Sequence, residues 1–413
     1  MKITVHYLSA SILVVIMAAL AQAQTYTKLY QFSGTSDGDS PNGPLFKDRT
    51  GNLYSSTYAA GNLNCNAPGG CGTLFKLGTT GKLTVLHTFS GPDGEGPLGG
   101  LVADSQGNGY GTASGGGNLS CQGNPPGCGI VYKIDRNGSL AVLYSFTGPD
   151  GDSPLGWLLR DATGNLYGAT VTGGTSNEGV VFEVDPSGHE TVLYSFTGGP
   201  GGAYPSSGLI EDSAGNLYGT TSYGGDFGYG NVFELTPSSN GWTETVLHSF
   251  AGGPSDGNAP TTNLVRDAKG NLYGTTIWGG SSNANYCLLG CGTLFRLSPV
   301  NGGWSETVLY SFTGGSDGAF PHGLVQDPNG ALYGTTTGGG SGTDCCGVVF
   351  KLGTTGKMTT LHTFTGTDGA NPSAILLLDL AAKTLYGTTE TGGDLSCKTL
   401  SGAGCGVVFK ITP

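Results

Sequence analysis

Charged residues are scarce in this sequence, and basic residues are the scarcer kind. Only 11% of the 413 residues are charged, with 17 Lys and Arg against 29 Asp and Glu, which gives a formal net charge of −12 and a pI near 4.8. The few basic residues are scattered and form no cluster. Because phosphate backbones and anionic lipid surfaces attract clustered cations, we expect neither nucleic acid nor an anionic membrane surface as a partner.

Helical periodicity and long hydrophobic runs are also lacking from most of the chain. Between Thr27 and Pro413, apolar residues at helical spacing never continue beyond about two turns, which predicts an all-β body. The exception is the apolar run at residues 8–20, which follows Lys2 and ends in an A-x-A cleavage pattern at residues 21–23. It is short for a membrane-spanning helix and typical of a secretory signal. We therefore expect a signal peptide over residues 1–23 and a secreted mature chain (extracellular, periplasmic or cell-surface) that no longer spans a membrane.

The rest of the chain is one segment repeated seven times. In each copy a Phe ends the first apolar run, a Pro closes a Gly-rich loop, and an Asp and a Tyr flank the next turn. These columns are Phe32, Phe89, Phe146, Phe196, Phe250, Phe312 and Phe364; Pro41, Pro97, Pro154, Pro205, Pro260, Pro321 and Pro372; Asp48, Asp104, Asp161, Asp212, Asp267, Asp327 and Asp379; and Tyr54, Tyr110, Tyr167, Tyr218, Tyr273, Tyr333 and Tyr386. The repeats start near residues 27, 83, 140, 190, 243, 305 and 357.

The repeat length and its internal pattern predict the fold. Each copy contains four short apolar or alternating runs separated by Gly, Asn, Asp and Pro, which are typical of strands. A period of about 50 to 62 residues suits propeller-type repeats, whose radial arrangement leaves only short, protected edges. We therefore expect residues 24–413 to form a single seven-bladed β-propeller with four antiparallel strands per blade. The Asp column begins a D-x-x-G-N turn, which predicts a structural role for it.

The ends of the chain predict how the ring closes. Hairpin-length links place the run after the Pro loop innermost and the V-L-Y-S-F run outermost. The chain then starts with an outermost strand, at residues 28–32, and ends with a third strand, at residues 406–411. We expect the N-terminal strand to close the last blade, with Tyr30 and Phe409 in adjacent antiparallel strands, because an open ring would leave an unpaired edge.

All cysteines lie in the loops between the second and third strands of five repeats. The pairs are Cys65 with Cys71, Cys121 with Cys128, Cys287 with Cys291, Cys345 with Cys346, and Cys397 with Cys405. An even number in local pairs predicts disulfides formed in an oxidising compartment. A zinc site needs four converging ligands, and each loop offers two thiols without a neighbouring His, so we favour disulfides.

Long loops predict where a binding site lies. Links from the second to the third strand, and from the outermost strand to the next innermost one, should emerge at one end of the propeller, and the other end should carry only tight turns. Loops on a rigid scaffold carry most binding residues, so we expect the site at the long-loop end. No cofactor is required by the sequence.

Acidic residues of this end suggest a cation site as one alternative. Six loops carry an Asp in a D-G turn, and three of them add a second acid two residues later. Ordinary turn geometry explains the first acid. The acids of three successive loops could instead form an arc for Ca²⁺ or a cationic partner, because Ca²⁺ takes several oxygen ligands. The candidate ligands are Asp37, Asp39, Asp93, Glu95, Asp150 and Asp152.

Three other residues are candidates for ligand binding. His322 follows the loop Pro and is expected at the channel mouth, where its counterparts form a ring with no carboxylate. Such a ring lacks the paired titratable groups of acid–base catalysis. Trp157 near the channel and Trp278 beside a long loop could stack on a sugar face or pack in the interior. No catalytic residue is predicted, since the three G-x-S-x-G matches, at residues 34–38, 253–257 and 314–318, join strand to strand rather than strand to helix.

At this level the repeat resembles a known family. The run G-N-L-Y-G-T-T-x-x-G-G, followed by G-x-V-F-x-L and T-V-L-Y-S-F, is similar to the tandem repeat of the choice-of-anchor GloVer-containing proteins over about residues 27–413. The resemblance implies an exported protein and brings no established catalytic residues. The sorting anchors that give that family its name are not visible before Pro413. Kelch-like propellers are a looser match, through the double Gly and the late Trp242 and Trp304.

These observations favour a secreted, monomeric, non-catalytic binding or interaction module for an extracellular glycan or protein. One alternative is an enzyme that acts on extracellular polysaccharide or peptide with its site on the long-loop face. Another is a structural envelope component that binds Ca²⁺. An enzyme should concentrate unrepeated titratable residues at the channel mouth, whereas a scaffold should keep the repeat symmetry there.

Overall fold

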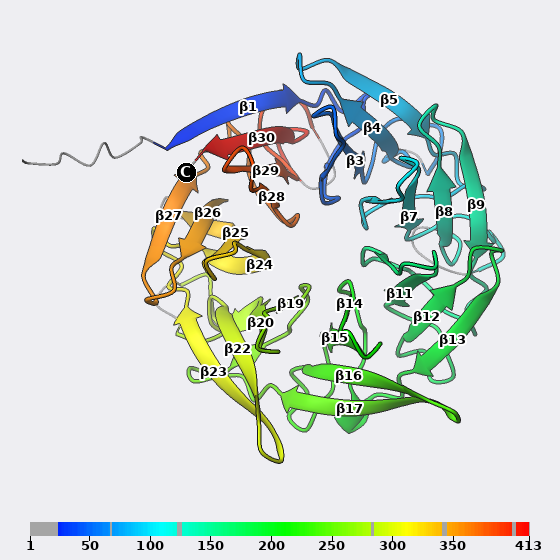
Figure 1. Ribbon diagram of the computed structural model, residues 1–413. Helices are drawn as coiled ribbons and strands as arrows, with labels where there is room; N and C mark the ends of the chain where they lie inside the picture. The colour runs from blue at the N-terminus through cyan, green and yellow to red at the C-terminus, as the bar shows by residue number, and fades with distance from the viewer. Residues whose placement is uncertain are drawn as a thin grey trace, which may run out of the picture.

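The chain forms a ring of seven four-stranded antiparallel sheets, as the repeat pattern predicts (Figure 1). The computed structural model describes residues 24–66, 68–121, 126–281, 285–340, 345–398 and 402–412. The predicted signal peptide, residues 1–23, lies outside the described residues. Within these ranges, no helix has the length and hydrophobicity that a membrane crossing requires.

Each sheet is one blade, and its strands follow the chain from the axis outwards. Blade 1 contains β2 (Phe46–Lys47), β3 (Leu53–Thr57), β4 (Thr73–Leu77) and β5 (Leu83–Thr88), and blade 2 contains β6 (Val102–Ala103), β7 (Gly109–Ala113), β8 (Ile130–Ile134) and β9 (Leu140–Ser145). Blade 3 contains β10 (Leu159–Arg160), β11 (Leu166–Thr170), β12 (Val180–Val184) and β13 (Glu190–Ser195), and blade 4 contains β14 (Ile210–Glu211), β15 (Leu217–Thr221), β16 (Asn231–Ser238) and β17 (Gly241–Ser249). Blade 5 contains β19 (Val265–Arg266), β20 (Leu272–Thr276), β22 (Thr293–Val300) and β23 (Gly303–Ser311).

Blade 6 contains β24 (Ala319–Gln326), β25 (Leu332–Gly340), β26 (Cys346–Leu352) and β27 (Met358–Thr363), and blade 7 contains β28 (Leu377–Asp379), β29 (Thr384–Thr389), β30 (Val407–Thr412) and β1 (Thr25–Gln31). The loops add a small sheet of β18 (Gly257–Asn258) and β21 (Trp278–Gly279) and the 3₁₀ turn η1 (Gly199–Gly201).

Blade 7 joins the two ends of the chain, which confirms the predicted closure. Strand β1 pairs antiparallel with β30, so the first and last strands lie side by side in Figure 1. Lys28 is opposite Phe409 and Tyr30 is opposite Val408, with a bulge between Lys28 and Tyr30. The ring is therefore closed by backbone hydrogen bonds, and this blade has no unpaired edge at β30.

The Phe column forms the contact between neighbouring blades. All seven of these Phe residues have an exposed fraction of at most 1%. Each ring meets an aromatic ring on the third strand of the next blade edge-on: Phe32 meets Phe75 at 5.2 Å between centroids, and Phe364 meets Phe409 at the same distance. Edge-to-face pairs of this kind stabilise beyond the apolar area they bury. One residue type at one repeat position thus builds the interblade core.

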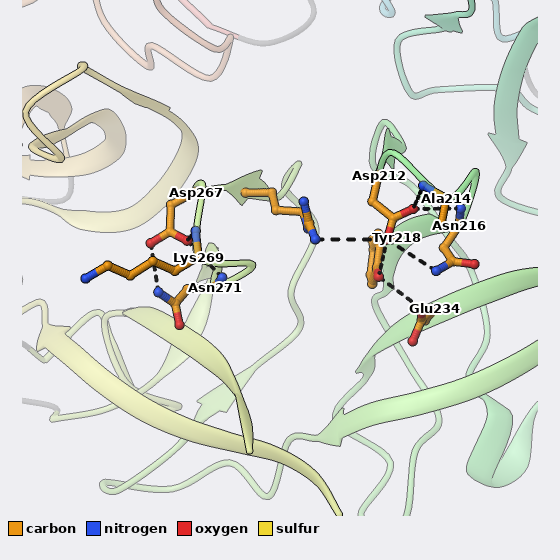
Figure 2. A network of polar contacts seen from close by, with 9 residues as sticks. Asp212, Ala214, Asn216, Tyr218, Glu234, Asp267, Lys269 and Asn271 are labelled. Atoms are coloured by element: carbon orange, nitrogen blue, oxygen red, sulfur yellow. Dashed lines mark hydrogen bonds and ion pairs between the residues drawn. The ribbon is translucent and has the colours of Figure 1, made fainter. Parts of the chain in front are cut away.

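The Asp column closes the inner hairpin turns, as predicted. In Figure 2, Asp212 accepts hydrogen bonds from the backbone N–H groups of Ala214 and Asn216, at 2.9 and 3.0 Å, and Tyr218 places its hydroxyl 3.1 Å from the same carboxylate. The same three bonds recur at Asp48, Asp104, Asp267 and Asp327. These turns define the short-turn face of the propeller.

The opposite end, the long-loop face, carries both sets of long loops. In several blades the loop before the innermost strand pairs with the loop after the second strand through a single bridge, for example Asp39 with Ala59 and Asp152 with Thr172. The two sets therefore emerge at the same end, as expected. All five predicted disulfides are formed in these loops.

Candidate functional site at the axial channel

Residues that follow the loop Pro of each repeat converge on the axis. The seven residues are Asn42, Leu98, Leu155, Ser206, Thr261, His322 and Ser373, and all of them line one cavity of about 280 Å³. Six of them precede the innermost strand of their blade and His322 lies within β24, so the cavity opens toward the long-loop face. The ring that the sequence places at the channel mouth is thus a physical site, and His322 belongs to it.

Trp157 also lines this cavity and breaks the sevenfold symmetry of its wall. The indole lies against Gly208 of the next blade, where an added Cβ would come within 2.1 Å of Trp157 Nε1. Ile375 and Gly323 form a second pair of the same kind, at 2.0 Å from Ile375 Cγ1. A glycine therefore makes room for each large side chain. Trp157 remains half-buried, so part of its ring surface is open to the cavity.

Several polar atoms of the channel wall have no partner. Ser206 Oγ, Thr261 Oγ1 and Asn263 Oδ1 are buried and make no hydrogen bond within the described part of the chain. Ser373 differs, because its hydroxyl bonds to Asn42. Buried polar groups are nearly always satisfied by protein or by ordered water. These three atoms are therefore available to hydrogen-bond water or a ligand in the channel.

The electrostatics of the channel are neutral. Of the described residues that line the cavity, His322 is the only one with an ionisable side chain. Burial lowers the pKa of His322 to about 4, because the charged imidazolium loses its hydration there. The ring is thus neutral at physiological pH, and it can donate or accept a hydrogen bond. It has no partner acid with which to share a proton.

The first acids of the long loops take part in turn contacts. Asp93 accepts hydrogen bonds from the backbone N–H and hydroxyl of Ser90, both at 2.8 Å, and lies 2.8 Å from His87 Nε2. Equivalent contacts join Tyr30 to Asp37, Tyr144 to Asp150, His248 to Asp256, Tyr310 to Asp317, and His362 to Asp368. Each first-position acid thus ties its loop to an outer-strand ring, which supports the turn interpretation.

The second acids do not converge with them into one site. Asp39 and Asp152 each accept a hydrogen bond from the following Ser, at 2.9 Å, and Glu95 accepts one from Asn66. Burial raises the pKa of Asp39 to about 6. Among the described residues, the one group of three candidate metal ligands is Cys65, Cys71 and Glu95, whose two sulfurs are already joined in a disulfide. No three of the six acids form such a group among the described residues, and the acidic arc stays a prediction.

Trp278 lies elsewhere on the long-loop face. It belongs to β21, pairs with Asn258 and does not line the cavity. The equivalent residue of blade 4 is Tyr223, which is 53% exposed and meets Tyr204 edge-on at 5.7 Å. Sequence reasoning missed these two tyrosines, because their repeat positions hold small or polar residues in most other copies.

The position of Tyr204 has an unusual backbone. The residue before the loop Pro adopts a left-handed conformation in every blade, with φ between +54° and +62° at Ser40, Gly96, Ser153, Tyr204, Ala259, Phe320 and Asn371. The N–H of Tyr204 donates to Glu178 O of the preceding blade at 2.9 Å, and its carbonyl accepts from Ser222 N at 3.2 Å. One strained residue per blade thus links two blades beside the channel. A non-glycine residue in this conformation needs such support.

Comparison with known proteins identifies the family of the repeat. The model of the Gloeobacter/Verrucomicrobia repeat matches residues 119–288 and 286–413, more than half of the chain. The chain belongs to this repeat family. The comparison with curated proteins found no match to this chain.

Solved structures share the fold of this Gloeobacter/Verrucomicrobia repeat protein at low identity. A streptogramin B lyase superposes with a TM-score of 0.60 at 14% identity, covering 94% of this chain and 97% of the lyase. Virginiamycin B lyase from Staphylococcus aureus gives 0.57 at 14% identity, covering 94% and 99%. An extracellular domain from B. thetaiotaomicron, from a protein described as a hybrid two-component system, gives 0.55 at 13% identity, covering 94% of this chain and 41% of that one. These likenesses show the propeller fold alone.

Proposed function

We propose that this protein is a secreted, non-catalytic binding protein that takes a neutral glycan at the long-loop end of its axial channel. The observation that carries the proposal is the chemistry of the cavity wall: unpartnered hydroxyl and amide oxygens beside a half-buried Trp, with no carboxylate among the described lining residues. Sugar hydroxyls supply the missing hydrogen bonds, and the indole face suits the apolar face of a sugar ring.

The same wall argues against catalysis at this place. Glycoside and peptide chemistry use convergent acid and base groups, and His322 is isolated and neutral. Secretion is compatible with the five disulfides, which form and persist in oxidising compartments. Two of the solved neighbours are lyases, so the experiment includes a test for reaction.

Calorimetric titration of the oxidised mature chain against a panel of neutral oligosaccharides tests the proposal. We expect binding by at least one glycan, weakened about fivefold in Trp157→Leu and in Thr261→Val, because stacking and one buried hydrogen bond each contribute about 1 kcal/mol. Trp304→Leu is the matched control, since Trp304 lies on an outer strand and meets Tyr218 edge-on at 6.5 Å.

Two outcomes would overturn the proposal. Affinity that is unchanged in both channel variants would place the ligand elsewhere on the protein. Mass spectrometry of the recovered glycan that reveals a cleaved or eliminated product would favour the enzyme interpretation instead.

A further inference from the structure

Grooves between neighbouring blades open on the short-turn face, and three of the seven contain a cation from the residue before the turn Asp. The residue before the turn Asp of one blade reaches toward the Tyr and Asp of the preceding blade. Between blades 7 and 1, Lys47 bonds to Asp379 and lies 5.1 Å from the centre of the Tyr386 ring. Between blades 4 and 5, Arg266 comes within 4.0 Å of Asp212, which is labelled in Figure 2. Between blades 2 and 3, Arg160 lies 5.5 Å from the centre of the Tyr110 ring.

The groove between blades 5 and 6 lacks this side chain. Its equivalent position holds Gln326, whose amide donates to Gly330 O of its own turn at 3.4 Å. The groove encloses about 440 Å³, whereas Lys47 lines two separate cavities of about 570 and 190 Å³ between blades 7 and 1. Gln326 folds back on its own blade and lines the pocket at this interface.

Two cations of blade 5 border this pocket. Arg296 stands opposite Tyr273 in the sheet, and its Nε is buried without a hydrogen-bond partner in the described part of the chain. Lys269 is exposed at the rim, and in Figure 2 its side chain extends away from the Asp212 network. A buried guanidinium N–H without an acceptor is costly, which points to an acceptor supplied from outside.

The two acids that line the pocket already accept hydrogen bonds from their own turns. Asp267 accepts hydrogen bonds from Asn271 and Tyr273, and Asp327 accepts one from Tyr333 together with two backbone N–H groups. Neither forms an ion pair with Arg296 among the described residues. The remaining wall is apolar and contains Leu309, Leu332 and Leu352.

We propose that this groove binds a small carboxylate, such as a uronic acid or a short aliphatic acid. The Arg296 guanidinium binds the carboxylate, because planar N–H donors match its two oxygens, and the three leucines contact the carbon skeleton. This site is on the face opposite the channel mouth and does not depend on the proposed glycan function.

Thermal unfolding and calorimetric titration with glucuronate, hexanoate and glucose test the assignment. We expect glucuronate, hexanoate or both to bind and raise the unfolding midpoint, and glucose to do neither, since only native-state binding stabilises. Arg296→Gln should weaken binding about tenfold or more, because it removes a charge-assisted hydrogen bond. Whether glucuronate or hexanoate binds more tightly distinguishes a sugar acid from an aliphatic acid as the source of the carboxylate.

A second variant places a longer, charged side chain in the groove. Gln326→Lys copies the residue that Lys47 provides between blades 7 and 1, so it should abolish carboxylate binding without lowering stability. Lys351→Gln is the matched control, because Lys351 occupies the same repeat position as Arg296 and lies 5.0 Å from the centre of the Tyr333 ring in the next groove. The absence of binding by either carboxylate would overturn the proposal, as would binding that persists in both Arg296→Gln and Gln326→Lys.

Discussion

On the outermost strands, a Tyr or His ring is bonded to a carboxylate, and the residue that supplies this carboxylate differs between blades. In blade 3 this ring is Tyr194, but the loop that follows has Gly201 where the other copies have Asp. Glu244 of the next blade replaces the missing acid and lies 2.8 Å from the Tyr194 hydroxyl. Glu306 of blade 5 occupies the same repeat position as Glu244. Here the loop Asp, Asp256, is present, so two carboxylates lie near the His248 ring.

This crowding predicts a pH dependence of stability. Burial and the charge of Asp256 raise the pKa of Glu306 to about 7, from a reference value of 4.5. Between these two values the folded state binds more protons than the unfolded state, so this group makes stability fall as pH rises toward 7. We expect Glu306→Gln to be more stable than the wild type at pH 8 and nearly equal to it at pH 5.

Urea denaturation at several pH values measures this effect. The variant Glu234→Gln, which alters a carboxylate bonded to Tyr218 in blade 4, serves as a control for the substitution itself. Parallel pH profiles for Glu306→Gln and the wild type would contradict the assignment of the shift to Glu306.

At the scale of elements, the disulfide loops hold the next blade as well as their own. The carbonyl of Cys291 accepts a hydrogen bond from Phe320 N at 2.8 Å, and Phe320 is the left-handed residue that begins blade 6. Blade 4 makes the same link without a disulfide, from Ala259 N to Tyr229 O at 2.9 Å. A short covalent loop therefore rigidifies a contact that the fold also forms without it.

Removal of one disulfide should lower stability and reduce amide protection near its own loop. The pair Cys287→Ser and Cys291→Ser should lower the free energy of unfolding by about 2 kcal/mol, the value for a loop of a few residues. Hydrogen exchange should accelerate at the Phe320 amide and stay unchanged at Ala259. Equal protection at Phe320 in both proteins would mean that the disulfide does not support the interblade link.

At the scale of the whole molecule, β1 converts an open arc into a ring. It is the outermost strand of blade 7, and it contributes Tyr26, which stacks on His362 of blade 6 with ring centres 4.1 Å apart. Deletion of residues 24–31 removes both contacts and exposes the edge of β30. We expect the truncated chain to aggregate, because unpaired edges recruit other strands.

Light scattering and size-exclusion chromatography measure this outcome. A synthetic peptide of residues 24–33 added in trans should restore the monomeric fraction, since it supplies the same pairing partner. A truncated chain that stays monomeric and equally stable would show that closure contributes little.

The local pattern of the sequence determined the architecture. Four columns, of Phe, Pro, Asp and Tyr, each filled seven times, predict the number of blades, the order of strands and the closing pair, and the local cysteine pairs predict the five disulfides. The pattern also led to His322, since the residue after the loop Pro must approach the axis in any propeller of this order, and to Trp157, which lies two residues after the equivalent Leu155. The resemblance to the repeat family agreed with this pattern and added no site.

Tertiary structure decided everything that depends on contacts between repeats. The unpartnered oxygens of Ser206 and Thr261 and the replacement of an absent Asp by Glu244 both arise across blade boundaries. The groove beside Gln326 is of the same kind, because residues of two blades line it. A repeat pattern specifies each blade by local spacing, whereas these features depend on which side chains of two separately specified blades meet in space.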